Sequence, residues 1–523
     1  MSLLDTVRAP VDPFAYAADL LDPPVHPYAA DIAGWTRNRL DEHMTADQTA
    51  ITTSVLQHRY SAVQSCHDVG KSYTAARIAD WWIDVHPPGE ALVVTTAPTW
   101  KQVRAVLWHE MARAHRKGGL IGRMTEACEW KIGTGSGPDE LVGLGLKPAD
   151  YDPSGFQGLH RRYVLVIIDE AGGVPKPIYD AADSLVTNAD CRMLAIGNPD
   201  DPSAHFEAIC RPGSGWNVLR IDALRSPNFT REAVAQFPKL RALMIREGIR
   251  PTTEDVPDRV RPLLVSPQWV AERIDRWGID SPLFTSKVRG TFPKITLDTV
   301  IQPGWVLAAQ LRELEPDITD PRISVDVARY GTDHSIIGLR QGGHYRQVDD
   351  IPYGSTTSLV GKVAIIARGY GPSVPAINVD DTGVGGGVTD MLLDDGFAVL
   401  PLVSGGRGKE ELPNGRPRFV NARSEWWWTL REALAGPSGD GSDGWLDIDP
   451  DDEDLAAQLL RTKYRVNRHG QIEVESKDDL KKRGFESPDR ADALVYAVVR
   501  ETPVKHVFGD RMVTPDIMAD DAW

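Results

Sequence analysis

An apolar run that ends in two adjacent carboxylates constrains this chain more than any other feature. Tyr163–Ile168 is rich in β-branched residues and is followed at once by Asp169 and Glu170. A short run of this kind predicts a strand buried on both faces, as in a parallel sheet covered by helices. Adjacent carboxylates at the end of such a strand are typical of a nucleotide-hydrolysing site, and the plain alternative is the start of a helix, where acidic residues are also favoured.

A candidate phosphate-binding loop precedes this strand in the sequence. The segment Ser65–Ser72 lies between a predicted strand and a predicted helix, but it has serine where a full motif has its first glycine. What remains is a glycine, a lysine and a hydroxyl, the groups that hold phosphates and Mg²⁺. The residues predicted to bind ATP are Gly70, Lys71, Ser72 and Asp169, with Ser72 and Asp169 as Mg²⁺ ligands and Glu170 as the residue that polarises the attacking water.

Two amide side chains complete the predicted nucleotide site. Asn198 follows the strand Arg192–Gly197 and is placed to sense the γ-phosphate, although Gly-Asn-Pro is also an ordinary turn. Gln48 precedes the first strand, and it either contacts the adenine or is a plain exposed glutamine. An arginine that neutralises transition-state charge is expected in the same domain. The sequence does not choose among Arg104, Arg123, Arg161 and Arg162.

Strand and helix patterns alternate from Tyr60 to Asn198. The predicted strands are Ser61–Ser65, Ala91–Thr96, Tyr163–Asp169 and Arg192–Gly197, and the predicted helices are Lys71–Val85, Thr99–Arg116 and Ile178–Val186. This alternation predicts an α/β domain with a parallel sheet and crossover helices. Residues 225–300 lose the alternation and predict a helical linker or lid with helices at Arg231–Glu247 and Pro267–Trp277.

A second set of carboxylates accompanies a new strand pattern after residue 320. Strands at 322–328, 335–340 and 345–351 are followed by a helix at 358–368 and a strand at 376–380, which is the order of a ribonuclease-H-like core. An acidic cage of this kind can hold two divalent metals, one activating water and the other stabilising the leaving oxygen. Each aspartate taken alone is equally well a cap, a turn or a solvated residue. The predicted metal ligands are Asp326, Asp333, Asp380, Asp489 and Asp492, of which Asp326, Asp380 and Asp492 are the predicted catalytic residues.

Charge and composition limit the classes of protein that this chain can belong to. At 523 residues with 41% hydrophobic composition it is long enough for two or three soluble domains. A net charge of −16 argues against a protein that coats nucleic acid non-specifically. Local basic clusters either hold a duplex or are solvated loops, and they lie at Arg407–Lys409, Arg416–Arg423 and Lys477–Arg483.

Neither a membrane span nor a cysteine framework is indicated. The longest apolar runs fall well short of the roughly 18 residues of a membrane helix, and the N-terminus lacks the pattern of a signal peptide. We therefore expect a cytoplasmic protein. The cysteines show no spacing typical of a zinc site or of a disulfide framework, and they are Cys66, Cys128, Cys191 and Cys210.

In this order, the motifs resemble those of the large terminase subunit of tailed double-stranded DNA bacteriophages. The resemblance covers roughly residues 45–500, and the segment Ser281–Pro293 also resembles the terminase junction between domains. Where the family commonly has glycine and arginine, this chain has Ser65, Cys66 and His67. The resemblance rests on Gln48, Gly70–Ser72, Val166–Ala171, Gly197–Pro199, Asp326–Asp333, Val379–Gly385 and Ser487–Leu494.

The resemblance implies an N-terminal packaging ATPase of the P-loop (RecA/ASCE-like) type and a C-terminal ribonuclease-H-like nuclease that uses two Mg²⁺ or Mn²⁺ ions. It implies double-stranded DNA as substrate, and a portal protein and a small terminase subunit as partners. It also implies a ring of subunits on the procapsid, with the chain possibly monomeric alone. The implied location is the cytoplasm of the bacterial host, with a transient stay at the procapsid portal. As the last nuclease ligand Asp492 is preferred to Asp489, because it lies one turn into its helix.

From these patterns we expect a lead-in at 1–44, an ATPase domain at 45–224, a helical linker at 225–300, a nuclease domain at 301–500 and a mobile tail at 501–523. Two other functions stay open. A helicase-nuclease of DNA repair or restriction would share both chemistries but should add a second RecA-like domain. A nucleotide-gated DNA-binding scaffold would have an inactive nuclease core.

Overall fold

The chain forms two compact units in a computed structural model that describes residues 26–133, 138–147, 159–294, 298–328, 334–352, 354–371, 375–412, 415–483 and 485–504. The first unit contains Gly70–Asp169, with chain segments before residue 62 and between residues 177 and 195. The second contains Ala62–Val69, Glu170–Lys176 and the chain from Ile196 onward. Asp333 lies outside the described residues, as do residues 505–523 of the tail predicted at 501–523.

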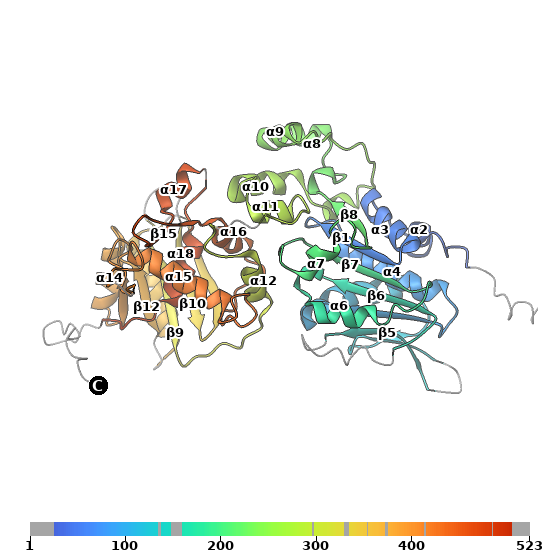
Figure 1. Cartoon of the computed structure of the whole chain (residues 1–523), viewed down its shortest axis with the longest axis horizontal. Coiled ribbons are helices and arrows are strands. Elements are labelled where there is room, and N and C mark those ends of the chain that lie inside the picture. Colours follow the sequence, from blue (N-terminus) through green and yellow to red (C-terminus); the bar gives the residue numbers. More distant parts are fainter. Residues whose placement is uncertain are drawn as a thin grey trace, which may run out of the picture. The chain divides into compact units, whose positions relative to one another are not determined.

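An eight-stranded sheet has the order β3-β4-β5-β2-β6-β7-β1-β8, and Figure 1 shows its strands side by side in blue to green. The central strand β2 pairs in parallel with β5 and β6, whereas β4 pairs antiparallel with β3 and β5. The predicted parallel-rich α/β sheet is therefore confirmed. Its strands are β1 (Tyr60–Ser65), β2 (Ala91–Thr96), β3 (Arg123–Met124), β4 (Glu129–Ile132), β5 (Glu140–Leu146), β6 (Tyr163–Asp169), β7 (Arg192–Gly197) and β8 (Asn217–Ile221).

Helices of the N-terminal part begin where the sequence offers caps. A capping box joins Thr45 and Gln48 at the start of α3. The buried Trp35 ring of α2 donates from Nε1 to Asp84 of α4 over 2.8 Å, which links these two helices. The helix predicted at Thr99–Arg116 is instead a π-helix, Gln102–Leu107, that runs into an α-helix. The α-helices are α2 (Ile32–Leu40), α3 (Ala46–Gln57), α4 (Lys71–Val85), α5 (Trp108–Gly118), α6 (Lys176–Asp183) and α7 (His205–Ile209).

Residues 225–300 form helices, as predicted, but one helix was predicted too long. The segment Arg231–Glu247 forms two helices because Pro238 starts the second, where its missing N–H costs nothing. Serine caps followed by proline also start α10 and α11. The helices of this region are α8 (Arg231–Ala235), α9 (Pro238–Arg246), α10 (Pro267–Trp277) and α11 (Pro282–Lys287), and α12 (Pro303–Leu311) follows it. No helix in the described part of the chain combines the length and apolar character that crossing a bilayer requires.

A five-stranded sheet has the order β11-β10-β9-β12-β13, and Figure 1 shows it in yellow to orange. Its first three strands are antiparallel and its last two continue in parallel with β9, the order predicted for a ribonuclease-H-like core. The strands are β9 (Pro321–Asp326), β10 (Ser335–Gln341), β11 (His344–Ile351), β12 (Ala376–Asp380) and β13 (Val399–Leu402), and a separate hairpin joins β14 (Tyr464–Val466) to β15 (Ile472–Val474). The helices are α13 (Thr356–Arg368), α14 (Gly385–Asp394), α15 (Ala422–Ala435), α16 (Glu453–Arg461), α17 (Lys477–Lys482) and α18 (Asp489–Val498).

Alternation along the central strands of this sheet separates a core face from a functional face. Val325 and Val379 join an apolar cluster with residues of α13 and α14. The residues that alternate with these valines along each strand point to the opposite face of the sheet. On that face the Asn378 amide donates to the carbonyl of Tyr496 in α18 over 2.7 Å. Asp326 and Asp380 share the parity of Asn378 and therefore end their strands on the face that α18 covers.

Asp80 on α4 is a buried carboxyl, and neither of its oxygens has a hydrogen-bond partner among the described residues. Burial raises its pKa well above the ordinary value, against the opposing charge of Arg77, so the folded chain keeps a proton that the unfolded chain loses near pH 4. Since the folded state then binds more protons, stability falls as the pH rises above that value.

We expect Asp80→Asn to be more stable than the wild type at neutral pH by about 1–4 kcal/mol, with the difference vanishing below about pH 4. Denaturant unfolding at pH 4, 6 and 8 measures this. Asp84→Asn is the matched control. Asp84 accepts a hydrogen bond from Trp35, so this substitution should lower the stability of the protein. The expectation is wrong if the difference in free energy of unfolding between Asp80→Asn and the wild type is the same at all three pH values.

Candidate active sites

In the candidate nucleotide site, a hydroxyl and a carboxylate meet in the first unit. Ser72 is the second residue of α4, and its Oγ donates to Oδ2 of Asp169 over 2.8 Å. Asp169 ends β6 and is 1% exposed, and Lys71 beside Ser72 is also buried. Hydroxyl and carboxylate oxygens are the ligands that Mg²⁺ prefers, so the donors present fit a magnesium ion held with a nucleotide.

Gly70 shapes the start of α4. Its φ is +74°, in the left-handed region, and a Cβ there would lie 2.5 Å from Nε2 of Gln48. The close approach leaves room for glycine alone. Oε1 of Gln48 accepts from the Thr45 amide in the capping box, so Gln48 is a buried residue beside the phosphate loop and not an exposed glutamine.

Glu170 adopts an unusual backbone conformation in the second unit. Its φ of 47° and ψ of 48° place a non-glycine residue in the left-handed region, a form of strain that clusters at functional sites. Gly197 at the end of β7 permits the turn, because a Cβ there would lie 2.7 Å from the amide nitrogen of Ala171. The Asn198 side chain donates to the carbonyl of Ser65 over 2.6 Å, so it fastens the base of the phosphate loop. Its predicted role in sensing the γ-phosphate stays a prediction.

The first half of the phosphate loop is held by the main chain of distant segments. Within the second unit, the amide of Cys66 donates to the carbonyl of Ile221 over 3.0 Å, and the amide of His67 donates to the carbonyl of Lys287 over 2.8 Å. These two amides are therefore engaged in main-chain hydrogen bonds. Cys66 and His67 are also residues at which the chain departs from the terminase loop pattern.

All four arginines considered for transition-state stabilisation are paired with carboxylates in the first unit. The shortest of these ion pairs joins Arg123 to Asp139 over 2.7 Å, and the others are longer than 3 Å. Exposed pairs of this kind are weak and exchange readily. The structure therefore leaves the choice among Arg104, Arg123, Arg161 and Arg162 open.

The second site lies where β9 and β12 end. These strands are parallel neighbours with Val325 opposite Val379, so Asp326 and Asp380 reach the same edge of the sheet. The helix α18 begins beside them with Asp489 and contains Asp492 one turn later. All four carboxylates are at least nine-tenths buried.

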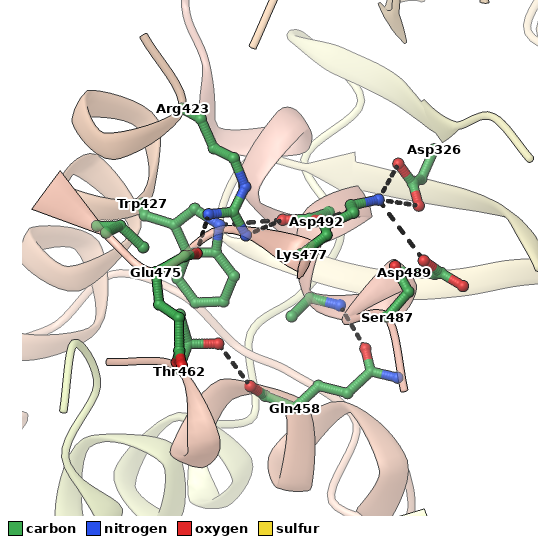
Figure 2. A network of polar contacts seen from close by, with 12 residues as sticks. Asp326, Arg423, Trp427, Gln458, Thr462, Glu475, Lys477, Ser487, Asp489 and Asp492 are labelled. Carbon is green, nitrogen blue, oxygen red and sulfur yellow. Dashed lines mark hydrogen bonds and ion pairs between the residues drawn. The ribbon is translucent and has the colours of Figure 1, made fainter. Parts of the chain in front are cut away.

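One ammonium group lies between these carboxylates. Nζ of Lys477, the first residue of α17, is 3.3 Å from both oxygens of Asp326, 3.6 Å from Asp489 and 3.1 Å from Asp492 (Figure 2). The predicted convergence of aspartates from a strand and a helix far apart in sequence is therefore present. Asp380 lies at the edge of the group, where its Oδ1 accepts from the Thr382 amide over 3.0 Å.

Asp492 is the most firmly held member of the cluster. Its Oδ1 accepts from Nε1 of Trp427 over 3.0 Å and from Arg423 over 3.3 Å, both on α15 (Figure 2). Burial alone would raise the pKa of Asp492, but Arg423 and Lys477 hold it below the usual value. An ionised carboxylate with a fixed orientation is what a metal ligand requires.

The pKa values of Asp326, Asp380 and Lys477 are also shifted by burial and by neighbouring charges. Burial raises the pKa of Asp326 well above its usual range, with Lys477 opposing and the neighbouring aspartates adding to the shift. Burial also raises the pKa of Asp380. For Lys477, burial acts to lower the pKa, but Asp326 and Asp492 raise it well above the ordinary value. Lys477 is therefore a cation at neutral pH and neutralises part of the cluster.

The donor set fits divalent metals, because carboxylate oxygens are the ligands that Mg²⁺ and Mn²⁺ favour. Among the described residues, however, no group of three or more carboxylates, imidazoles and thiols has the spacing to hold a metal ion. The aspartates surround the Lys477 ammonium instead. Binding of metal at this place requires Lys477 to withdraw. Asp333 is outside the described residues.

Lys477 was missed as a site residue by reasoning from the sequence, which placed it in a basic cluster on the surface. A signal was available, because Ser476 caps α17 and puts Lys477 in the first turn, where a cation is disfavoured by the helix dipole. A lysine at such a position indicates a specific anionic partner. Arg423 belonged to another of the basic clusters and likewise points inward.

We expect Lys477→Met to make folding depend on divalent ions. Removing the cation leaves buried carboxylates uncompensated, which should lower the free energy of unfolding in EDTA by about 3–5 kcal/mol, and Mn²⁺ or Mg²⁺ should restore it. Denaturant unfolding with and without metal measures this. The control is Lys482→Met, which changes a 76% exposed lysine on the same helix. A Lys477→Met variant as stable in EDTA as the wild type would contradict the assignment.

Comparison with known proteins identifies a relative along most of the chain. No family model matches this chain. A curated protein described as "Probable terminase, large subunit" of Enterobacteria phage P7 is 23% identical over 466 residues, which is 84% of this chain and 84% of that protein. The chain resembles a phage large terminase subunit. The resemblance to terminases that the sequence motifs predicted is confirmed.

Solved terminase structures are also similar to this chain. A large terminase from a thermophilic bacteriophage, in complex with ADP, has 10% identity and a TM-score of 0.37, covering 86% of this chain and 98% of that chain. The nuclease domain of the large terminase subunit gp2 of bacterial virus Sf6 has 18% identity and a TM-score of 0.34, covering 39% and 100%. The large terminase nuclease from thermophilic phage G20c with bound magnesium has 14% identity and a TM-score of 0.28, covering 39% and 98%.

Proposed function

We propose that this chain is the large subunit of a phage DNA-packaging terminase. It hydrolyses ATP to move double-stranded DNA into a procapsid and cuts the concatemer with a metal-dependent endonuclease. The observation that best supports this is the meeting of Asp326, Asp489 and Asp492 at one point beside the end of a ribonuclease-H-ordered sheet. The same chain pairs Ser72 with Asp169 at the end of a parallel sheet.

In the ATPase, each residue has a role that follows from its chemistry. Lys71 would bind the β- and γ-phosphates, and Ser72 and Asp169 would hold Mg²⁺, which supplies neutralising charge to the phosphates when bound. Glu170 orients and polarises the attacking water. Gln48 supports the nucleotide from the side of Gly70, and Asn198 couples the strand end to the loop.

In the nuclease, Asp326, Asp380 and Asp492 are the catalytic carboxylates, and Asp489 is a further ligand. They would hold two Mg²⁺ or Mn²⁺ ions, which supply an activated water and stabilise the leaving oxygen. Arg423 and Trp427 keep Asp492 in position. Asp333 belongs to the proposed ligand set by its place in the sequence.

Partners and location follow from the resemblance to terminases. We propose a homo-oligomeric ring docked on the portal protein of a procapsid, with a small terminase subunit that selects DNA, in the cytoplasm of the bacterial host. The proposed domains are an ATPase domain at 45–224, a linker at 225–300 and a nuclease domain at 301–500.

Two assays of the purified full chain test the proposal. ATP hydrolysis is measured with and without double-stranded DNA, and nicking of supercoiled plasmid is measured with Mg²⁺, with Mn²⁺ and in EDTA. The proposal expects ATP turnover that DNA accelerates, and cleavage that EDTA abolishes. A chain that hydrolyses ATP but leaves plasmid intact at every metal concentration would instead be a nucleotide-gated scaffold, a function favoured by the occupation of the carboxylate cluster by Lys477.

A further inference from the structure

Lys287, the last residue of α11, is a mostly buried cation that forms an ion pair with Asp200. Its side chain is 18% exposed, and its Nζ donates to Oδ2 of Asp200 over 2.7 Å. The other oxygen of Asp200 has no hydrogen-bond partner among the described residues. Withdrawing a lysine and an aspartate from water is costly unless the two are paired, so each side chain holds the other in place. None of the roles proposed for the ATPase residues uses this pair.

The pair completes a closed set of contacts around the base of the phosphate loop. The carbonyl of Lys287 accepts from the His67 amide over 2.8 Å. Two residues before His67, the Ser65 carbonyl accepts from the Asn198 side chain over 2.6 Å. Two residues after Asn198, the Asp200 carboxylate accepts from the Lys287 ammonium. Lys287 therefore joins the phosphate loop to the turn that follows β7, and all of these residues belong to the second unit.

The turn after β7 lies directly against the backbone that follows Glu170. A Cβ added to Gly172 would lie 3.0 Å from the carbonyl oxygen of Asn198, and the Asp200 amide donates to that same carbonyl over 3.0 Å. The left-handed backbone of Glu170 costs free energy and persists only where the surrounding structure holds it. Asp200 belongs to that surrounding structure, because it fixes the carbonyl on which the Glu170 turn packs.

Three carboxylates stabilise the charged form of Lys287. Burial acts to lower the pKa of Lys287, but Asp200, Glu170 and Glu453 raise it above the ordinary value. Lys287 is therefore an ammonium ion at neutral pH. A neutral side chain at this position would leave the Asp200 carboxylate unpaired in a mostly buried place, and the turn that carries it would be free to move away.

We propose that Lys287 is a positioning residue for ATP hydrolysis, which holds Asp200 and with it the turn against which Glu170 is placed. The inference rests on the proposed ATPase function, and it assigns part of the hydrolytic machinery to α11, outside the eight-stranded sheet. Lys287 acts on the residue proposed to polarise water and not on Lys71, the proposed phosphate ligand. Its loss should therefore reduce the rate of hydrolysis and leave the binding of ATP unchanged.

The test compares steady-state ATP hydrolysis by variants of the full chain, with the rate expressed per bound molecule of a fluorescent ATP analogue. Lys287→Met should lower kcat about 10–100-fold and leave KM within about twofold of the wild-type value. Lys287→Arg keeps the charge and the donor, so it should hydrolyse ATP faster than Lys287→Met. Lys239→Met is the control, because Lys239 of α9 also pairs with an aspartate, Asp275, but is 73% exposed. It should hydrolyse ATP at the wild-type rate.

Asp200→Asn tests the same pair from the other side. It should lower kcat and leave KM unchanged, as Lys287→Met does. The double variant Lys287→Met/Asp200→Asn should be no slower than Lys287→Met, because the effects of two residues that act through one contact do not add. Losses that multiply in the double variant would show that Lys287 does not act through Asp200 and would overturn the proposal.

Folding of each variant is checked by its thermal unfolding temperature. If Lys287→Met does not fold, Asp200→Asn decides, because it keeps the size of the side chain and removes its charge. A wild-type kcat in either folded variant, or a raised KM with an unchanged kcat, would overturn the role of Lys287. If the wild type does not hydrolyse ATP, the proposed function and this inference fail together. Turnover by the wild type that neither substitution alters removes the inference alone.

Discussion

Replacing Asp326 with alanine is expected to abolish metal-dependent cleavage of DNA while ATP hydrolysis continues at the wild-type rate. Asp326 ends the central strand of its sheet, and both of its oxygens face the point where the carboxylates meet. Losing a metal ligand there removes several kcal/mol of transition-state stabilisation, so the rate should fall by about 10³-fold or more. Conversion of supercoiled plasmid to nicked and linear forms measures cleavage, and phosphate release measures ATP turnover.

The control for this variant is Asp440→Ala, which removes a carboxylate from a surface turn where it is held by Ser438 and Ser442. It should cut plasmid at the wild-type rate. If Asp326→Ala retains metal-dependent cleavage, the assignment of a nuclease to the C-terminal sheet is wrong.

Lys71→Ala and Glu170→Gln are expected to have the reverse effect, with ATP turnover lost and plasmid cleavage retained. Lys71 is predicted to bind the phosphates, so Lys71→Ala should weaken nucleotide binding as well as turnover. Glu170→Gln keeps the shape of the side chain but removes its charge, so it should bind ATP and fail to hydrolyse it, with a loss of about 10²–10⁴-fold. Binding of a fluorescent ATP analogue separates the two effects.

Matched controls are Lys101→Ala and Glu90→Gln, which change exposed residues of the same N-terminal region. Neither should alter ATP turnover. If Glu170→Gln hydrolyses ATP at the wild-type rate, another residue polarises the water and the assignment of Glu170 fails.

Much of the fold was predictable because its central strands are short apolar runs, and among the described strands β6, β9 and β12 end at an aspartate. The run at Tyr163–Asp169 and the strand at Ala376–Asp380 lie where the sequence placed them. The strand β5 was missed because glycines weaken its pattern. Gly145 is nevertheless required there, since a Cβ would lie 2.5 Å from Nε1 of Trp108, and that contact joins segments far apart in the sequence.

Candidate site residues could be predicted where they lie at the end of a strand or the start of a helix. They could not be predicted where their position depends on packing against segments far away in the sequence. That Asp326 and Asp492 would lie together could be predicted from their order and their places on a strand and a helix. Lys477 was not found, because the residue that explains it, Asp326, is 151 positions away in the sequence. The buried state of Arg461 likewise depends on carbonyls contributed by two other segments. Buried cations of this kind are visible only in three dimensions.

The main-chain hydrogen bonds that fasten the phosphate loop have a consequence for dissecting the protein. The carbonyl of Lys287 receives the amide of His67, and the amide of Val265 donates to the carbonyl of Asp68 over 3.0 Å. Gly290 packs so tightly here that a Cβ would lie 2.1 Å from the oxygen of Ile221, the acceptor of the Cys66 amide. A shortened protein that stops at residue 224 would therefore lose these supports, and an autonomous ATPase fragment has to extend beyond Gly290.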